Sequence, residues 1–186
     1  MKISYMCANT YVDASVLGRG AFPYPPELYD PEVGARSVEA ALGNARLADD
    51  LGFDWISVSE HHYAPGIVTP NASVLAGALS QVVRRAKIAV LGPIVSINNP
   101  VRIAEEIALL DMLTGGRVIV FLLRGTPNEF STYYTNPYES RPRSHEAITL
   151  IREALTQPQP FGWEGRYFKY PTIAVWPRPT QRPLPA

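Results

Sequence analysis

The chain has 186 residues, of which 46% are hydrophobic and 18% charged, a composition typical of a globular protein with one core. Lysine plus arginine and aspartate plus glutamate number 17 each, so the zero net charge argues against nucleic acid or a membrane surface as partner. The single cysteine, Cys7, excludes an internal disulfide, and without an apolar leader or an apolar run of 18 residues the expected location is the cytoplasm.

The first predicted elements are a strand, a helix and a second strand. Residues 2–7 are typical of a short strand, and a long segment rich in proline and tyrosine follows it. The proline cluster at 22–31 cannot form continuous helix, so we expect a loop that serves either as a lid or as inert surface. Apolar residues at helical spacing predict a helix over 35–52, and residues 53–59 predict the second strand.

The two later strands are apolar on both faces. Residues 71–85 predict a helix with Asn71 as its N-cap, and strands are predicted over 86–97 and 117–125. Strands that lack polar alternation are typical of a parallel sheet that is covered on both sides.

Two further helices complete the pattern. One is predicted over 99–116, with Asn99 as its N-cap and Gly115 as its stop. The other is predicted over 139–156 and is expected to begin after Pro142, because proline is disfavoured inside a helix.

Strands alternate with helices four times, which indicates the α/β class. An open doubly wound sheet and a (β/α) barrel both fit this order. The G-x-G-x-x-G motif of a dinucleotide-binding fold does not follow the first strand. Residues 1–186 are interpreted as a single domain, and the proline-rich segment 171–186 is expected to form an extended tail.

The sequence SEHH, which ends the second strand, has three interpretations. Glu60, His61 and His62 are consecutive, and three consecutive strand residues cannot converge on one ion, so a metal site is disfavoured. Side-chain alternation places His61 on the same face as Ser57 and Ser59, pointing inward at the mouth where a barrel carries its chemistry. Proton transfer or ligand contact by His61 is therefore favoured, and incidental polar residues at a loop mouth are the alternative.

Polar residues also follow the third and fourth strands. Arg124 ends a very apolar strand, so its guanidinium needs an anionic partner, either a ligand phosphate or carboxylate or an internal ion pair with Glu60 or Glu129. Asn98 or Asn99 could donate a hydrogen bond to a ligand carbonyl, with helix capping as the alternative.

Several segments together resemble the bacterial luciferase-like flavin-dependent oxidoreductases. They are LADDLGFDWISVSEHHY, RRAKIAVLGPIV with NNPVRIAEEIALLDMLTGGR, LLRGTPNEF and GWEGRYFKYPTIAVWPRPTQRPLP. Their order and spacing extend the resemblance across most of residues 37–180.

This resemblance implies a (β/α)8 TIM-type barrel that binds FMN in its reduced form at the carboxyl-terminal mouth. His61 and His62 match the two histidines of the family's E-H-H motif, which is tied to catalysis, and Glu60 matches its glutamate. Arg124 matches an arginine that contacts the flavin phosphate. Asn98, at the mouth of the third strand, is taken as a further cofactor-binding candidate.

The resemblance also implies a reaction. Leu75 and Ala76 fall near a segment that packs on the isoalloxazine ring, sometimes through a cis peptide. Reduced FMN would react with O₂ to form a C4a-peroxide that oxidises a small-molecule substrate, and a separate flavin reductase would supply the reduced flavin. A deazaflavin-dependent hydride transfer and a non-catalytic flavin-binding or assembly module are the two alternatives.

A complete barrel has eight strands and typically about 250 residues. Only about the first four β/α units are predicted here, so residues 1–186 are interpreted as the N-terminal half of such a barrel. Half a barrel leaves open strand edges and an apolar inner face, and we therefore expect a homo-oligomer or a complementing second half. In this fold the loops determine which substrate binds, and the sequence does not identify that substrate.

Overall fold

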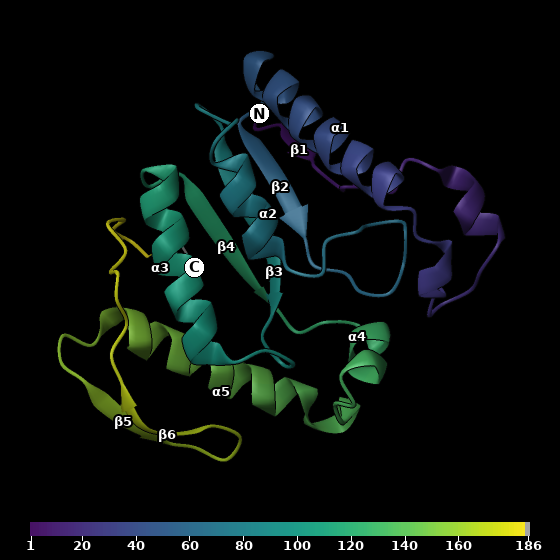
Figure 1. The fold of residues 1–186 in the computed structure, drawn as a ribbon. Coiled ribbons are helices and arrows are strands. Elements are labelled where there is room, and N and C mark those ends of the chain that lie inside the picture. The colour runs from purple at the N-terminus through teal and green to yellow at the C-terminus, as the bar shows by residue number, and fades with distance from the viewer. Residues whose placement is uncertain (185–186) are drawn as a thin grey trace. The chain divides into compact units, whose positions relative to one another are not determined.

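The structure is a computed structural model that describes residues 1–184 (Figure 1). It divides into two compact units, one from Met1 to Val90 and one that begins at Leu91, and each is described by itself. Strand β3, Lys87–Ile94, crosses the division, and the strand order is β1-β2-β3-β4. The α/β class and the parallel sheet are thereby confirmed, and the strands of residues 1–184 do not close into a barrel.

The first unit alternates strands and helices as expected. Strand β1, Ser4–Met6, pairs in parallel with β2, Trp55–Ser59. Helix α1, Pro31–Asp50, connects the two strands, and helix α2, Ala72–Leu79, follows β2 (Figure 1). Both helices contact β2, so the apolar side chains of that strand lie under a helical layer.

The long segment between β1 and α1 is not a bare loop. It contains two short 3₁₀ helices, η1 at Ala14–Gly18 and η2 at Pro26–Leu28. Tyr11, Val16 and Val33 form a small buried apolar cluster beneath them. The predicted loop at 22–31 therefore packs on its own core.

Helix α2 is shorter than predicted because a carboxylate captures the backbone that follows it. Asp49 lies in α1 and is 3% exposed. Its side chain accepts hydrogen bonds from the backbone N–H groups of Arg84, at 2.8 Å, Arg85, at 3.1 Å, and Ala86, at 2.7 Å. These N–H groups are then unavailable to a helical ladder, so the helix cannot continue to residue 85. It ends at Leu79, after which the N–H groups of Gln81 and Val82 donate to carbonyls only three residues back.

The second unit contains three helices, of which two form its main layer. Helix α3, Pro100–Thr114, packs against helix α5, Pro137–Thr156 (Figure 1). Strand β4, Val118–Leu123, follows α3. A short helix, α4 at Pro127–Thr132, lies between β4 and α5.

The helix ends show which local signals were informative. Asn99 caps α3 through hydrogen bonds to its side chain, and Gly115 ends the helix at φ 60°, as predicted. Helix α5 begins at Pro137, with Asn136 as its N-cap, so the predicted start after Pro142 was wrong. Pro142 is exposed in the second turn, where the helix tolerates the missing N–H group.

An antiparallel hairpin, β5 at Phe161–Glu164 and β6 at Lys169–Ile173, was not predicted. Strand β6 takes up the first residues of the segment expected to be an extended tail, and residues 185–186 of that tail lie outside the described residues. Further along, the buried carboxylate of Asp111 accepts hydrogen bonds from Thr180 and Gln181, which fixes this part of the tail to α3.

The carboxylate of Glu146 in α5 binds the hairpin through several hydrogen bonds. Glu146 accepts hydrogen bonds from the backbone N–H groups of Tyr167 and Phe168, both at 3.0 Å, and from Nε1 of Trp163 at 3.2 Å. Burial raises the pKa of this carboxyl, but the hydrogen bonds outweigh that effect and hold the pKa below its usual value.

The Glu146→Ala variant should therefore loosen the hairpin without unfolding the helices. We expect amide hydrogen exchange in β5 and β6 to accelerate roughly tenfold, since hydrogen bonds to a charged group contribute about 1.5–3 kcal/mol. Glu164→Ala is the matched control, because this exposed hairpin residue pairs only with Lys169. Equal acceleration in both variants would show that Glu146 is not the anchor.

The two strands predicted to be covered on both faces differ. Strand β3 is buried along nearly its whole length, which confirms the prediction. In β4, Phe121 is 40% exposed and Leu123 is 42% exposed, so full burial of this strand was wrong for the chain as described. Among residues 1–184, no helix combines the length and the apolar character needed to cross a membrane.

Candidate functional site

The end of β2 brings two of the predicted catalytic-motif residues together. Glu60 and His62 are 6% and 7% exposed, and Oε1 of Glu60 lies 3.3 Å from Nε2 of His62. Because they are two residues apart, extended backbone places both side chains on one side of the chain. A carboxylate in hydrogen-bond contact with an imidazole orients the ring.

His61 lines a cavity of about 280 Å³ in the first unit. Its backbone N–H donates to the carbonyl of Thr69 at 3.0 Å, which folds the segment after β2 back on itself. The proline cluster of the N-terminal segment forms another wall, through Tyr24, Pro25 and Leu28 among others. The segment considered as a lid thus shares a cavity with His61.

Backbone hydrogen bonds hold the two walls of this cavity together. The N–H of Tyr24 donates to the carbonyl of Tyr63 at 3.0 Å, and the N–H of Tyr11 donates to the carbonyl of Pro65 at 3.0 Å. Tyr63 has a left-handed backbone, at φ 58°, which turns the chain directly after the histidines. The cavity is therefore a built feature of the first unit.

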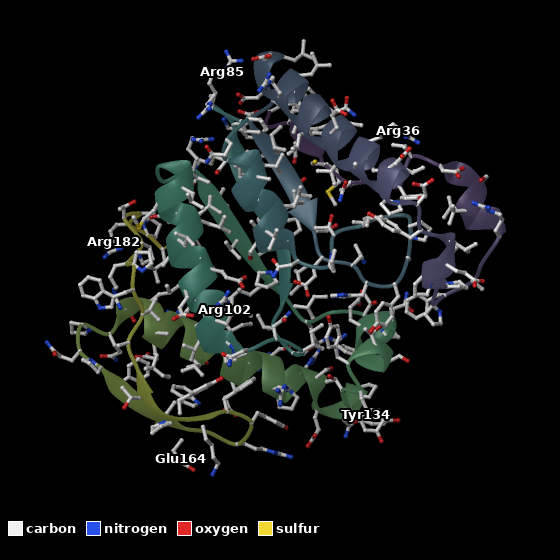
Figure 2. All side chains as sticks on the ribbon, viewed as in Figure 1. Arg36, Arg85, Arg102, Tyr134, Glu164 and Arg182 are labelled. Atoms are coloured by element: carbon white, nitrogen blue, oxygen red, sulfur yellow. The ribbon has the colours of Figure 1, made fainter. Side chains whose placement is uncertain are left out.

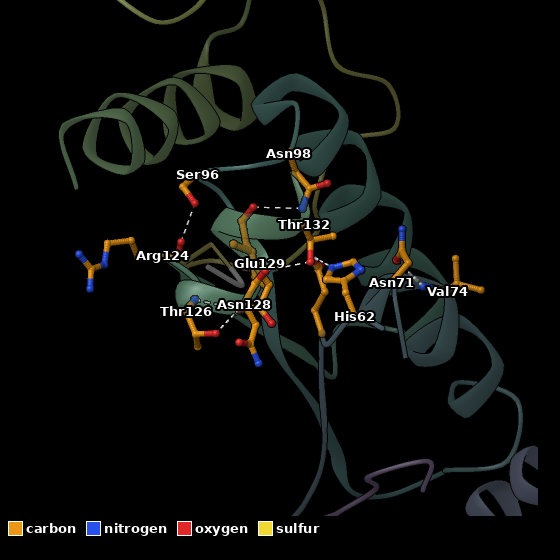
Figure 3. A network of polar contacts seen from close by, with 12 residues as sticks. His62, Asn71, Val74, Ser96, Asn98, Arg124, Thr126, Asn128, Glu129 and Thr132 are labelled. Carbon is orange, nitrogen blue, oxygen red and sulfur yellow. Dashed lines mark hydrogen bonds and ion pairs between the residues drawn. The ribbon is translucent and has the colours of Figure 1, made fainter. Parts of the chain in front are cut away.

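Arg124 follows β4 in the second unit, and a residue of the segment after β3 holds its backbone by a hydrogen bond. The buried hydroxyl of Ser96 donates to the carbonyl of Arg124 at 2.6 Å (Figure 3). The next residue, Gly125, has φ 92°, and a Cβ at this position would lie 2.7 Å from Cγ2 of Ile94. Glycine is required here both for the backbone conformation and for the close approach.

The guanidinium of Arg124 is exposed and lines a cavity of about 740 Å³. It lies 6.0 Å from the centre of the Phe130 ring, and within residues 1–184 no ion pair involves it. Glu129, one of the considered partners, instead accepts hydrogen bonds from Thr126 in a helix-capping box. Figure 3 shows the guanidinium extending away from Glu129.

Polar and aromatic groups complete the cavity around Arg124. Ser131, Thr135 and Asn136 contribute hydroxyl and amide groups to its lining. Tyr134, labelled in Figure 2, lines it as well and is fully exposed. A cation with several neutral donors around it is suited to an anionic ligand such as a phosphate.

The remaining predicted cofactor residues are placed differently. Asn98 donates from Nδ2 to the carbonyl of Ile94 at 3.0 Å, which is a local structural bond. Leu75 and Ala76 are 8% and 0% exposed inside α2, and the three cis peptides of the described chain lie elsewhere. Neither residue lines the cavity that contains His61.

Two residues in or beside these cavities were not singled out from the sequence. Ser96 lies two residues after the end of β3, and its bond to Arg124 depends on the segments that follow β3 and β4 meeting. Tyr63 directly follows the two histidines and could have been included as their neighbour. In residues 1–184, no group of three or more histidine, cysteine, aspartate or glutamate side chains could hold a metal ion.

Comparison with known proteins identifies relatives along most of the chain. A family model described as luciferase-like monooxygenase matches residues 21–186. The uncharacterized protein y4wF of Sinorhizobium fredii is 30% identical over 172 residues, covering 92% of this chain and 49% of that protein. The alkanal monooxygenase beta chain of Vibrio harveyi is 28% identical over 144 residues, which cover 75% of this chain and 43% of that protein. The chain thus spans about half the length of the curated relatives it matches.

Solved structures agree in fold. Monooxygenase RslO1 of Streptomyces bottropensis has a TM-score of 0.82 at 24% identity and covers 100% of this chain and 52% of its own. The oxygenating constituent of 3,6-diketocamphane monooxygenase of Pseudomonas putida, in complex with FMN, scores 0.73 at 19% identity, covering 93% and 43%. An F420-dependent secondary alcohol dehydrogenase scores 0.75 at 20% identity, covering 97% and 49%.

Proposed function

The chain belongs to the luciferase-like monooxygenase family, and from this premise we propose that it is a flavin-dependent monooxygenase, or the part of one that carries the first four β/α units of a TIM-type barrel. The observation that carries the proposal is the guanidinium of Arg124. It lies at the end of an apolar strand, without an ion pair among residues 1–184, and it faces a cavity with neutral donors. A guanidinium beside neutral hydrogen-bond donors is suited to binding an anionic ligand.

The residues present fit the phosphate of FMN. A guanidinium presents a planar fork of donors that matches two phosphate oxygens. Ser131 and Thr135 line the same cavity and can add hydroxyl donors. Gly125, directly after Arg124, lets the backbone pack closely against Ile94 and so fixes where the arginine begins.

When bound, reduced FMN would supply the electrons that activate O₂ for transfer to a small-molecule substrate. Arg124 would bind and orient the cofactor through its phosphate. His61 would hold or move a proton at its imidazole, a group suited to general acid–base catalysis. Glu60 would orient the ring of His62, and the apolar walls beside His61 would exclude water.

Partners follow from the same proposal. A flavin reductase in the cytoplasm would supply the reduced cofactor. A second copy of the chain or a complementing second half would cover the apolar groups that β4 exposes, including Phe121 and Leu123. A deazaflavin is the alternative cofactor, because a neighbour of the same fold is described as F420-dependent.

The test is a titration of the purified chain with oxidised FMN, reduced FMN and a deazaflavin, with light scattering to measure mass. We expect saturable binding of FMN by an oligomer, and reductase-coupled O₂ consumption that depends on the chain. Saturable binding of the deazaflavin alone would replace FMN with the alternative cofactor. Failure of every flavin to bind at millimolar concentration would contradict the proposal for this chain.

A further inference from the structure

The cavity beside His61 has walls of an unusual kind. Tyr11, Tyr24, Tyr29 and Tyr63 all contribute to the lining, and prolines from two separate segments lie between them. Tyrosine and proline rings are flat, rigid and largely apolar, so they present broad faces with little conformational entropy to lose on binding. Such walls are suited to a ring-containing ligand more than to a flexible chain.

The lining carries no fixed charge. None of the residues that the structure gives as lining this cavity is an aspartate, glutamate, lysine or arginine. His61 is the one histidine among them. A charged ligand would lose hydration on entering and would meet no carboxylate, ammonium or guanidinium group in the lining. The cavity therefore selects for a neutral ligand, in contrast to the cavity that contains Arg124.

Two of the tyrosine hydroxyls in the lining already form hydrogen bonds with the backbone. The hydroxyl of Tyr11 is engaged with the backbone of Asp30, and the hydroxyl of Tyr24 donates to the carbonyl of Leu17. The hydroxyl of Tyr63 has no hydrogen bond within residues 1–184, and the ring of Tyr63 is 56% exposed. It remains as a donor for an acceptor oxygen on the ligand.

We propose that this cavity is the binding site of the organic substrate, and that the substrate is a neutral compound of one or two rings bearing an acceptor oxygen such as a carbonyl. The volume of about 280 Å³ lies just below the usual range for small-molecule pockets, so it limits the ligand to one or two rings. The inference rests on the proposed function for the statement that the ligand is the substrate. The binding preference itself follows from the cavity alone.

Isothermal titration with four probes tests the preference. Acetophenone is neutral and flat, benzoate has nearly the same shape with a negative charge, 2-octanone has the same carbon count without a ring, and ethylbenzene lacks the oxygen. We expect saturable binding of acetophenone, and at least about tenfold weaker binding of benzoate because its charge is unpaired in the cavity. Benzoate that binds as tightly as acetophenone would contradict the preference for a neutral ligand. 2-Octanone that binds more tightly than acetophenone would contradict the preference for a ring.

Three variants test whether acetophenone binds in the cavity beside His61. Ile67 lines the cavity and is half-buried, so Ile67→Trp should fill the space and abolish acetophenone binding. Tyr63→Phe keeps the wall and removes only the hydroxyl, so it should weaken acetophenone severalfold and leave ethylbenzene unchanged. Tyr138→Ala, a highly exposed tyrosine that lines neither cavity, is the matched control. Unchanged acetophenone binding in both cavity variants would overturn the site.

The outcome can be separated from that of the proposed function. Acetophenone binding without any flavin binding would contradict the monooxygenase proposal and leave the cavity's preference intact. Flavin binding without acetophenone binding would overturn this inference alone. Oxygen consumption that acetophenone stimulates in the original chain, and fails to stimulate in Ile67→Trp, would support both.

Discussion

The Arg124→Ala variant should bind FMN about 10- to 100-fold more weakly than the original chain and should bind riboflavin equally well. A hydrogen-bonded charge pair of this kind contributes roughly 1.5–3 kcal/mol, and each 1.4 kcal/mol corresponds to a tenfold change in affinity. Riboflavin lacks the phosphate, so it does not use the guanidinium. Flavin fluorescence quenching measures both affinities.

Two further variants sharpen this result. Arg124→Lys keeps the charge and loses the planar fork, so its affinity for FMN should lie between those of the original chain and the alanine variant. Arg152→Ala removes an exposed arginine of α5 that lines neither cavity and controls for the loss of one positive charge. Equal weakening of FMN and riboflavin by Arg124→Ala would mean that the guanidinium does not bind phosphate.

The Asp49→Ala variant should lose about 3 kcal/mol of unfolding free energy. The substitution leaves the backbone N–H groups of Arg84, Arg85 and Ala86 without their acceptor, and each buried donor without a partner costs roughly 1–3 kcal/mol. Urea unfolding of the two chains measures the difference. Asp50→Ala is the control, since its neighbouring side chain is 69% exposed and pairs with Arg85 only at 3.7 Å. Equal losses in the two variants would contradict a special role for Asp49.

The same carboxylate predicts a pH dependence. Burial raises the pKa of Asp49, but the N–H groups of residues 84–86 and the charge of Arg85 outweigh it and hold the pKa below its usual value. A depressed pKa in the folded chain means that ionised Asp49 stabilises the fold above the unfolded pKa of about 3.9, and that this contribution is lost as the pH falls through the folded value. The stability difference between the original chain and Asp49→Asn should therefore be full at pH 7 and shrink below pH 4. A difference that stays constant over this range would contradict the assignment.

Elements with local signals were predicted well from the sequence. Helix α3 has an asparagine–proline start and a glycine stop within its own residues, and both of its ends were correct. Helix α5 carries the same kind of start at Asn136 and Pro137. Pro142 obscures this signal, because a proline usually marks a helix start and here lies inside the helix. The true end of α2 could not be predicted, because it depends on Asp49, more than thirty residues earlier.

The polar residues that line the two cavities are conspicuous in the sequence, whereas the cavity walls are not. His61 and Arg124 stand out because a polar side chain that directly follows an apolar strand is conspicuous. The tyrosine walls depend on contacts between the N-terminal segment and the turn after the histidines, such as the bond from Tyr24 to Tyr63. Tyrosine and proline in a long segment carry no periodicity, so their convergence on His61 is visible only in three dimensions.

The division of the chain after Val90 also separates its tryptophans. Trp55 lies in the first unit, whereas Trp163 and Trp176 lie in the second. A variant with phenylalanine at 163 and 176 would emit tryptophan fluorescence from the first unit alone, and a variant with phenylalanine at 55 would emit it from the second. Melting curves of the two variants that coincide would show one cooperative transition, and curves that separate would give each unit its own melting temperature. The chain thus contains an intrinsic optical reporter for each of its units.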